Sequence, residues 1–183
     1  MRKNMKLLIH TCCAPCLGAP LKHLREETDF ELTGFWFNPN IHPFQEYKRR
    51  LDTLRDYTEK QNLPMIYDDY YGLVEFTRGV SGKEDDRCGY CYETRLVKAA
   101  ATAQANGFDA FTSTLLYSRY QKHDLIHEIG ERIAREFDIQ FYYADWRKYW
   151  QEGIEISKAA EMYRQQYCGC IYSEADRYMP KAK

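Results

Sequence analysis

Short apolar runs alternate along this chain with longer stretches in which apolar residues recur every three or four positions. The apolar runs predict five buried strands, at residues 6–10, 31–37, 64–67, 110–115 and 139–143. The longer stretches predict helices at residues 17–28, 44–61, 90–105, 122–137 and 154–167. Residues 68–86 and 146–153 follow neither pattern and are predicted to be irregular.

Strands that alternate with helices predict an α/β fold, with a parallel sheet covered by helices on both faces. Such sheets bind ligands outside the carboxyl ends of their strands, where the strand order reverses. Cys12 and Cys13 follow the first predicted strand directly. The sequence therefore predicts a site at this end of the sheet.

Length and composition favour one globular domain that spans residues 1–183. The chain is 44% hydrophobic and 29% charged, which is ordinary for a protein with its own core. The net charge of −1 gives no chain-wide basic surface, so nucleic-acid binding would need a local patch. The apolar stretch near the first residue is too short for a signal peptide or a membrane span, and we expect a cytoplasmic protein.

All seven cysteines stand in three tight groups. These are Cys12-Cys13-Ala14-Pro15-Cys16, Cys88-Gly89-Tyr90-Cys91 and Cys168-Gly169-Cys170. Thiols in the cytoplasm stay reduced, and an odd number fits disulfides poorly. Gathered thiolates repel one another unless a cation is present. The spacing therefore predicts a soft-metal site, either an iron–sulfur cluster or zinc.

Seven cysteines are too many for one centre, because a cubane cluster and a zinc ion each take four ligands. Adjacent residues in an extended chain point to opposite sides, so we expect Cys12 and Cys13 to face different centres, or one of them to be a free thiol. Four plus three ligands would leave a second metal with one open position. A structural zinc site is less favoured because its two C-x-x-C steps usually lie about 15–20 residues apart. A thioredoxin-like pair would leave five cysteines unexplained.

Five ordered motifs give a resemblance that covers residues 10–173. The matching segments are His10-Thr11-Cys12-Cys13-Ala14-Pro15-Cys16; Phe37-Asn38-Pro39-Asn40-Ile41-His42-Pro43 with Glu46-Tyr47 and Arg50; Arg87-Cys88-Gly89-Tyr90-Cys91-Tyr92 with Arg95-Leu96; Thr112-Ser113-Thr114-Leu115-Leu116; and Tyr163-Arg164-Gln165-Gln166-Tyr167-Cys168-Gly169-Cys170-Ile171-Tyr172-Ser173. With these segments the chain resembles the cobalamin-independent epoxyqueuosine reductases of the QueH family.

The resemblance implies a single-domain Rossmann-like fold related to the adenine-nucleotide alpha-hydrolase (HUP) proteins. It also implies a 4Fe–4S cluster with an adjacent mononuclear metal, iron or alternatively zinc. The implied reaction is the last step of queuosine biosynthesis, in which the epoxide of epoxyqueuosine in tRNA is reduced to an alkene by electrons from an unidentified donor. Related folds carry a glycine-rich phosphate loop where this chain has its first cysteine group, so we expect no ATP use.

We divide the cysteines between two centres. Cys12, Cys88, Cys91 and Cys170 are assigned to the cluster, and Cys13, Cys16 and Cys168 to the adjacent metal. Exchanging Cys12 with Cys13, or Cys168 with Cys170, fits the spacing almost as well, and one cysteine could bridge both centres.

Other residues are candidates for the chemistry and for the anticodon loop. The candidate general acids are Asp85, Asp86, Tyr90 and Asp145. The candidate substrate contacts are Asn38, Asn40, His42, Glu46, Arg50, Tyr117 and Arg119. Local basic patches lie at Lys48-Arg49-Arg50 and at Arg119 with Lys122, and the candidate aromatic platforms are Tyr117, Tyr120, Tyr142, Tyr143 and Trp146. His10 is interpreted as a buried, hydrogen-bonded histidine rather than a ligand.

Two other functions use the same residues differently. A non-catalytic tRNA-binding protein would hold structural zinc and would unfold on chelation. An ATP-dependent tRNA sulfurtransferase would consume ATP, which the missing phosphate loop argues against.

Overall fold

The computed structural model describes residues 4–180 and contains one parallel sheet of five strands. The strands are β1 (Lys6–His10), β2 (Glu31–Trp36), β3 (Met65–Tyr67), β4 (Ala110–Ser113) and β5 (Gln140–Phe141), in the order β3-β2-β1-β4-β5. After β1 the chain builds one half of the sheet, and it then returns to build the other half on the opposite side. The strand order thus reverses at β1, between β2 and β4. The predicted α/β fold and all five predicted strands are confirmed.

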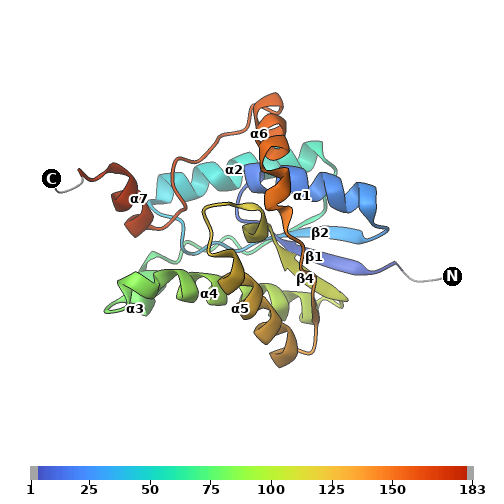
Figure 1. The fold of residues 1–183 in the computed structure, drawn as a ribbon, viewed down its shortest axis with the longest axis horizontal. Coiled ribbons are helices and arrows are strands. Elements are labelled where there is room, and N and C mark those ends of the chain that lie inside the picture. Colours follow the sequence, from blue (N-terminus) through green and yellow to red (C-terminus); the bar gives the residue numbers. More distant parts are fainter. Residues whose placement is uncertain (1–3, 181–183) are drawn as a thin grey trace.

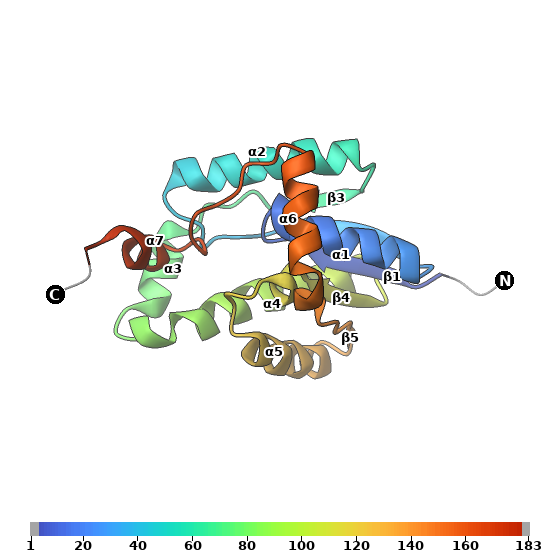
Figure 2. The ribbon, with the colours of Figure 1, turned by 45° about the horizontal axis from the view of Figure 1, so that its top comes forward.

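Helices cover both faces of the sheet (Figures 1 and 2). On one side lie α1 (Ala14–Glu27), α2 (Phe44–Lys60) and α6 (Trp150–Ala159), and on the other lie α4 (Arg87–Ala105) and α5 (His123–Glu136). Two short helices, α3 (Leu73–Val80) and α7 (Ile171–Tyr178), lie at the end of the molecule opposite the first strand's start. None of the described helices combines the length and the apolar character needed to cross a membrane.

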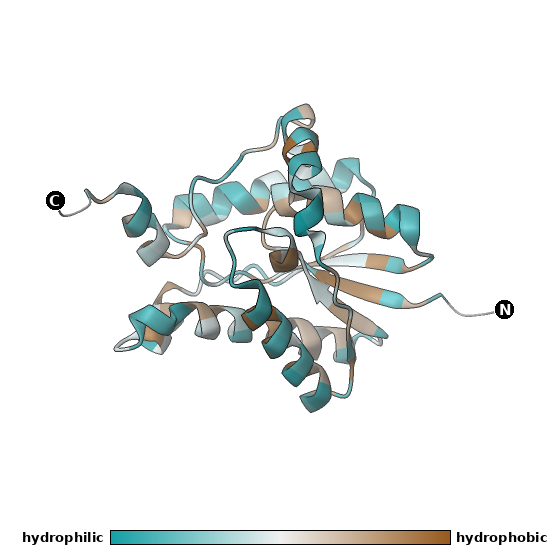
Figure 3. Ribbon diagram, in the orientation of Figure 1, coloured by the Kyte–Doolittle hydropathy of each residue, from teal (hydrophilic) through white to brown (hydrophobic). Residues whose placement is uncertain are grey.

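The core lies between the sheet and these helices. Leu7, Leu8 and Ile9 in β1 are fully buried, as expected for a central strand covered on both faces. In Figure 3 the visible strands are brown or white beyond their hydrophilic first residues, whereas the helices alternate between apolar and polar positions. The cysteine-bearing segments are therefore fixed to a rigid framework.

Two segments predicted to be irregular are in fact helical. Residues 68–86 contain α3, which packs closely against α4 at Gly79: a Cβ atom there would come within 2.2 Å of the Tyr90 ring. Residues 146–153 form a 3₁₀ turn at Trp146–Tyr149 that leads into α6, and the Asp145 carboxylate accepts a hydrogen bond from the Arg147 N–H at its start. Short helices of this kind have too few residues to show a clear hydrophobic period.

The last predicted helix, at residues 154–167, is also corrected. It begins earlier, at Trp150, and ends at Ala159, and Glu161 then adopts a left-handed φ of 51° that a helix cannot continue through. An irregular segment with bends runs from there to Cys170, and α7 follows without having been predicted. The third cysteine group therefore lies on a strap, residues 160–170, rather than at the end of a helix.

Candidate metal centre

The first cysteine group lies at the point where the strand order reverses. β1 ends at His10, which is in register with Phe35 of β2 and Ser113 of β4. The chain then turns into α1, whose N-cap is Cys13. Beside this turn is a pocket of about 710 Å³ whose lining includes cysteines from the first and third groups: Cys12, Cys16 and Cys168. The site thus lies where the sequence placed it.

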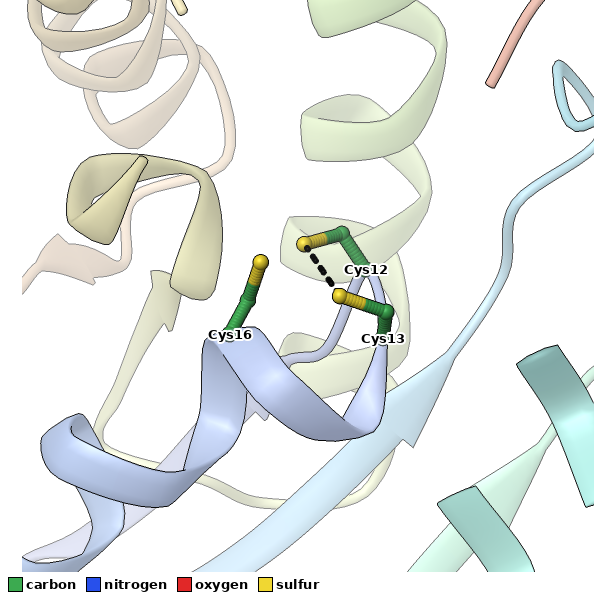
Figure 4. A group of neighbouring side chains, drawn as sticks. All are labelled: Cys12, Cys13 and Cys16. Carbon is green, nitrogen blue, oxygen red and sulfur yellow. Dashed lines mark hydrogen bonds between the residues drawn. The ribbon is translucent and has the colours of Figure 1, made fainter. Parts of the chain in front are cut away.

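Cys12, Cys13 and Cys16 form a compact triad of sulfurs. Their three Sγ atoms lie within 4.8 Å of one another, and the Sγ atoms of Cys12 and Cys13 are 3.9 Å apart. Figure 4 shows the three side chains pointing toward one another. Metal–sulfur bonds of about 2.3 Å in a tetrahedral site place two sulfurs about 3.8 Å apart. The donor set therefore fits a single metal ion, and it is equally a set of thiolates that an iron–sulfur centre can use.

The expectation that Cys12 and Cys13 point to opposite sides is wrong. Side chains alternate only while the chain stays in a strand, and β1 has already ended at His10. The backbone N–H of Cys12 donates to the Thr114 hydroxyl at 3.0 Å, and that hydroxyl donates to the Cys12 sulfur at 3.2 Å. Thr114 therefore turns the Cys12 side chain toward the other two sulfurs.

The three thiols differ in how readily they ionise in the absence of a cation. Hydrogen bonds from Cys13 and Cys16 hold the pKa of the Cys12 thiol well below its usual range. Burial raises the pKa of Cys13, and hydrogen bonding with Cys12 raises the pKa of Cys16. A bound cation is what would allow all three thiols to ionise together.

The other two cysteine groups converge on the same place. Cys88 and Cys91 are three residues apart at the start of α4, and therefore on one helix face, and burial raises the pKa of Cys91 to about 12. Cys170 is the N-cap of α7, and its sulfur accepts a hydrogen bond from the Ser173 N–H at 3.4 Å. Arg95 lies in electrostatic contact with one cysteine from each group: Cys12, Cys91 and Cys168. Segments far apart in the sequence thus contribute thiols to one region.

Arg50 and Glu46 hold the strap that carries the third group. The Arg50 guanidinium donates to the Glu46 carboxylate at 2.7 Å, to the Cys168 carbonyl at 2.7 Å and to the Tyr167 carbonyl at 3.0 Å. The Tyr163 hydroxyl donates to the second Glu46 oxygen at 2.7 Å. Both residues were predicted to contact substrate. Arg50 does line the pocket, but its hydrogen bonds go to the strap and to Glu46.

His42 and Gly169 fix the strap at its other end. The His42 N–H donates to the Gly169 carbonyl at 2.8 Å, and the His42 carbonyl accepts from the Tyr167 hydroxyl at 2.5 Å. Gly169 has a φ of 155°, which side-chain-bearing residues rarely adopt, and this explains a glycine between two cysteines. His42 is fully buried, so its predicted substrate contact would require the strap to move.

Asn38 and Asn40 are buried and lie outside the lining of the pocket. The Asn38 amide donates to the Thr11 carbonyl at 3.0 Å and accepts from Arg95 at 3.1 Å. The Oδ1 atom of Asn40 is buried without a hydrogen-bond partner among the described residues. Asn38 therefore positions Arg95, and neither amide contacts the pocket surface.

Of the predicted aromatic platforms, Tyr117 and Tyr120 line the pocket. Tyr117 is stacked on Trp150 with ring centres 5.2 Å apart, whereas Tyr120 meets the edge of Trp150 and is 83% exposed. Arg119 lies 5.9 Å above the Trp150 ring. The remaining three candidates lie outside the pocket lining: Tyr142, Tyr143 and Trp146.

The four candidate general acids also lie outside the pocket lining. Asp85 and Asp86 are exposed in a 3₁₀ turn, and Tyr90 packs on α3. Asp145 is paired with Arg147 at 2.6 Å, and this hydrogen bond lowers the pKa of the Asp145 carboxyl to about 2. A carboxylate with such a low pKa is a poor proton donor near neutral pH. A catalytic role for any of the four stays a prediction that this geometry does not favour.

Three polar side chains at the cysteines were not predicted as site residues. The Gln165 amide donates to the Cys13 sulfur at 2.9 Å, and the Gln121 amide donates to the Cys168 sulfur at 3.2 Å. Arg95 is the third. Gln165 and Arg95 lie within the motifs that carry the resemblance, but a glutamine or arginine there shows nothing in sequence that separates it from a surface residue. Gln121 lies outside those motifs, so nothing in the sequence pointed to it.

The interpretation of His10 as a buried, hydrogen-bonded histidine is confirmed. Its Nε2 atom lies 3.2 Å from the Phe37 carbonyl and must donate to it, so the neutral ring accepts at Nδ1 from the Ser113 hydroxyl at 2.8 Å. Burial, reinforced by the charge of Arg95, lowers the pKa of His10 to about 3. His10 is therefore neutral and already fully hydrogen-bonded.

Folding stability is expected to fall between pH 6.5 and pH 4 because of His42. Burial lowers the pKa of His42 to about 4 in the folded protein, from 6.5 as an ordinary histidine. Between pH 6.5 and pH 4, His42 is protonated in the unfolded chain but stays neutral in the folded one. This difference lowers the free energy of unfolding by on the order of 2 kcal/mol at pH 5. Urea titrations at pH 7 and pH 5 should show a smaller pH dependence for His42→Gln than for the unaltered protein. His127→Gln, which alters a half-exposed histidine of α5, provides the control. Equal pH dependence in His42→Gln and the unaltered chain would contradict the prediction.

The chain was compared with known proteins. The family model described as epoxyqueuosine reductase QueH matches residues 7–176. A protein named epoxyqueuosine reductase QueH from Dehalococcoides mccartyi is 39% identical over 173 residues, which are 94% of this chain and 94% of that protein. Proteins of the same name from Histophilus somni and Thermotoga maritima are 40% and 33% identical, over 93% of this chain and over 73% and 91% of their own lengths. The match runs through all three cysteine groups and the framework that gathers them, and the chain belongs to the epoxyqueuosine reductase QueH family.

Proposed function

We propose that this protein reduces the epoxide of epoxyqueuosine in tRNA to the alkene of queuosine. The convergence of three cysteine groups on one region around the buried Arg95, beside a pocket that the first and third groups line, is the observation that carries the proposal. Family membership names the same activity. The overall change consumes two electrons and two protons, and the epoxide oxygen leaves as water. An electron donor of undetermined identity must therefore supply the pair of electrons.

The cysteines provide ligands for two centres, one a 4Fe–4S cluster and the other an adjacent metal ion, iron or zinc. When bound, the cluster passes electrons singly, and an ion with an open position acts as a Lewis acid for the departing oxygen. The close triad of Cys12, Cys13 and Cys16 suits the single ion. Cubane ligands bind four different irons and stand further apart, which suits Cys88, Cys91, Cys168 and Cys170. Compared with the partition drawn from the sequence, this one exchanges Cys12 and Cys168.

The chain's own residues prepare these ligands. Thr114 and Gln165 donate hydrogen bonds to Cys12 and Cys13, and Gln121 does the same for Cys168. Such hydrogen bonds fix the direction of a sulfur and stabilise its anion. The thiols are thus oriented toward the pocket before any metal binds.

The mouth of the pocket suits a single-stranded anticodon loop. Tyr120 presents an exposed ring on one side, where a splayed base can stack. Arg164 on the strap and Arg177 on α7 line the pocket, and within residues 4–180 neither forms an ion pair. Asp176, the one carboxylate that lines the pocket among the residues that the structure describes, is paired with Arg87 at 2.5 Å. Two uncompensated guanidinium groups beside an aromatic ring provide phosphate contacts and a stacking surface.

Replacing Arg164 or Arg177 by glutamine is expected to weaken tRNA binding about tenfold, or about 1.4 kcal/mol. Each change should also lower the salt slope of log Kd by about 1, because one phosphate contact is lost. Binding of unmodified tRNA at several salt concentrations measures both quantities. The control is Arg135→Gln, which removes an exposed arginine of α5 that lies outside the pocket lining. Equal losses in all three variants would assign the effect to overall charge instead.

Two assays test the proposed function. Protein purified without oxygen is analysed for iron, zinc and acid-labile sulfide, and is then given tRNA that carries epoxyqueuosine together with a chemical reductant. We expect about four irons with four sulfides plus one further metal, and conversion of the epoxide to the alkene. Zinc without sulfide, and no conversion after reconstitution with iron and sulfide, would overturn the proposal in favour of a zinc-stabilised tRNA-binding protein.

A further inference from the structure

Arg95 is a buried cation whose hydrogen bonding is incomplete. It lies on α4, one helical turn after Cys91, and is 3% exposed. Its Nη1 atom donates to Asn38, but Nε and Nη2 have no hydrogen-bond partner among the described residues. Burying a charge with two free donors costs several kcal/mol unless something in the site compensates it. The folded chain alone therefore leaves this guanidinium unsatisfied.

The surroundings hold the guanidinium in place without neutralising it. Asn38, its one hydrogen-bond partner, is itself fixed by the carbonyl of Thr11, directly before Cys12. An amide has no charge, and none of the ion pairs within residues 4–180 includes Arg95. His10, which also feels the charge of Arg95, is neutral. The nearby groups that can carry negative charge are the thiols of Cys12, Cys91 and Cys168.

Metal loading would supply the missing charge. The empty triad carries at most the one negative charge of the Cys12 thiolate, whereas four thiolates from the second and third cysteine groups around a divalent ion would leave two net negative charges. A cluster held by four thiolates is also an anion. The guanidinium is therefore better stabilised in the loaded site than in the empty one, and by the same argument it favours loading.

We propose that Arg95 is the positioning residue and counter-ion of the thiolate centre, with Nε–H and Nη2–H donating to its sulfur ligands. It favours metal binding and makes added electrons easier to accept, because a positive charge and hydrogen bonds to sulfur raise reduction potentials. The inference rests on the proposed metal site but not on the proposed reaction.

The test uses Co²⁺ as a probe of the apo protein, with affinity read from thiolate–cobalt absorption in competition with a chelator. Arg95→Met keeps the length of the side chain and removes its charge, and should weaken Co²⁺ binding by about 10–100-fold. Arg95→Lys retains the positive charge but lacks the several N–H donors of the guanidinium. Its Co²⁺ affinity should lie between those of Arg95→Met and the unaltered chain. The matched control is Lys98→Met on the same helix, whose lysine pairs with Asp68 at 2.8 Å away from the pocket. It should bind Co²⁺ as the unaltered chain does.

A second measurement uses the protein reconstituted with iron and sulfide. In it, Arg95→Met should shift the midpoint reduction potential of the cluster to a more negative value. If Arg95→Met fails to fold, Asn38→Ala, which releases the guanidinium, should weaken Co²⁺ binding in the same direction. Unchanged Co²⁺ affinity in whichever of these two variants folds would overturn the inference, even if the enzyme reduces epoxyqueuosine. Arg95-dependent Co²⁺ binding in a protein without reductase activity would instead support the inference and overturn the proposed function.

Discussion

We expect the same metal to be lost from each of three variants, Cys12→Ser, Cys13→Ser and Cys16→Ser. Turnover should fall by more than about 100-fold in each, which is the upper end of the loss seen for residues that only support a metal ligand. The three sulfurs lie within 4.8 Å of one another, so they are close enough to bind one ion together. Serine keeps nearly the volume of cysteine, and its hydroxyl is a poor ligand for soft metals. The fold should therefore survive while the centre does not.

Cys12→Ser decides between the two partitions of the cysteines. If the triad is one centre, this variant has the metal and sulfide content of Cys16→Ser, with the cluster retained. If Cys12 instead binds the cluster together with Cys88 and Cys91, as the sequence suggested, Cys12→Ser has the metal and sulfide content of Cys88→Ser. Iron, zinc and sulfide per chain distinguish these outcomes. Ser157→Ala is the control, because it alters a buried hydroxyl in the wall of the same pocket without removing a sulfur.

The sequence was sufficient for the strands and for the position of the site. Buried parallel strands are continuous apolar runs, and residues such as Leu7, Leu8 and Ile9 show this directly. Cysteines at the end of the first strand must then lie at the carboxyl edge of the sheet. Both inferences depend only on local pattern and on the general rules of α/β folds.

The details that failed depend on contacts between distant segments. Residues 68–86 were predicted to be irregular, but α3 forms there and packs at Gly79 against the Tyr90 ring. Cys12 turns toward Cys13 because of Thr114, a hundred residues along the chain. His42, Glu46 and Arg50 were predicted to contact substrate, which stays a prediction; the structure shows that they hold the strap, a role that the sequence did not indicate. A motif identifies the residues that belong to a site. It does not separate residues that contact metal or substrate from residues that hold the contacting segments in place.

Arg50→Met is expected to destabilise the apo protein by about 3–5 kcal/mol. The Arg50 and Glu46 side chains are 3% and 10% exposed, so removal of the guanidinium leaves a buried carboxylate without its partner. The carbonyls of Tyr167 and Cys168 lose their donors at the same time. The free energy of unfolding from urea titration measures the loss.

Two further variants separate the ion pair from the rest of the helix. Arg55→Met removes an arginine five residues later on α2, which is 44% exposed and pairs with Asp69 at 3.1 Å. This change should lower the free energy of unfolding by at most about 1 kcal/mol. Glu46→Gln combined with Arg50→Met removes the unpaired charge and should recover part of the loss. A double variant no more stable than Arg50→Met would show that the carbonyls of the strap, rather than the carboxylate, account for the effect. In that case Arg50 stabilises the fold chiefly by fixing the segment that brings Cys168 and Cys170 to the pocket.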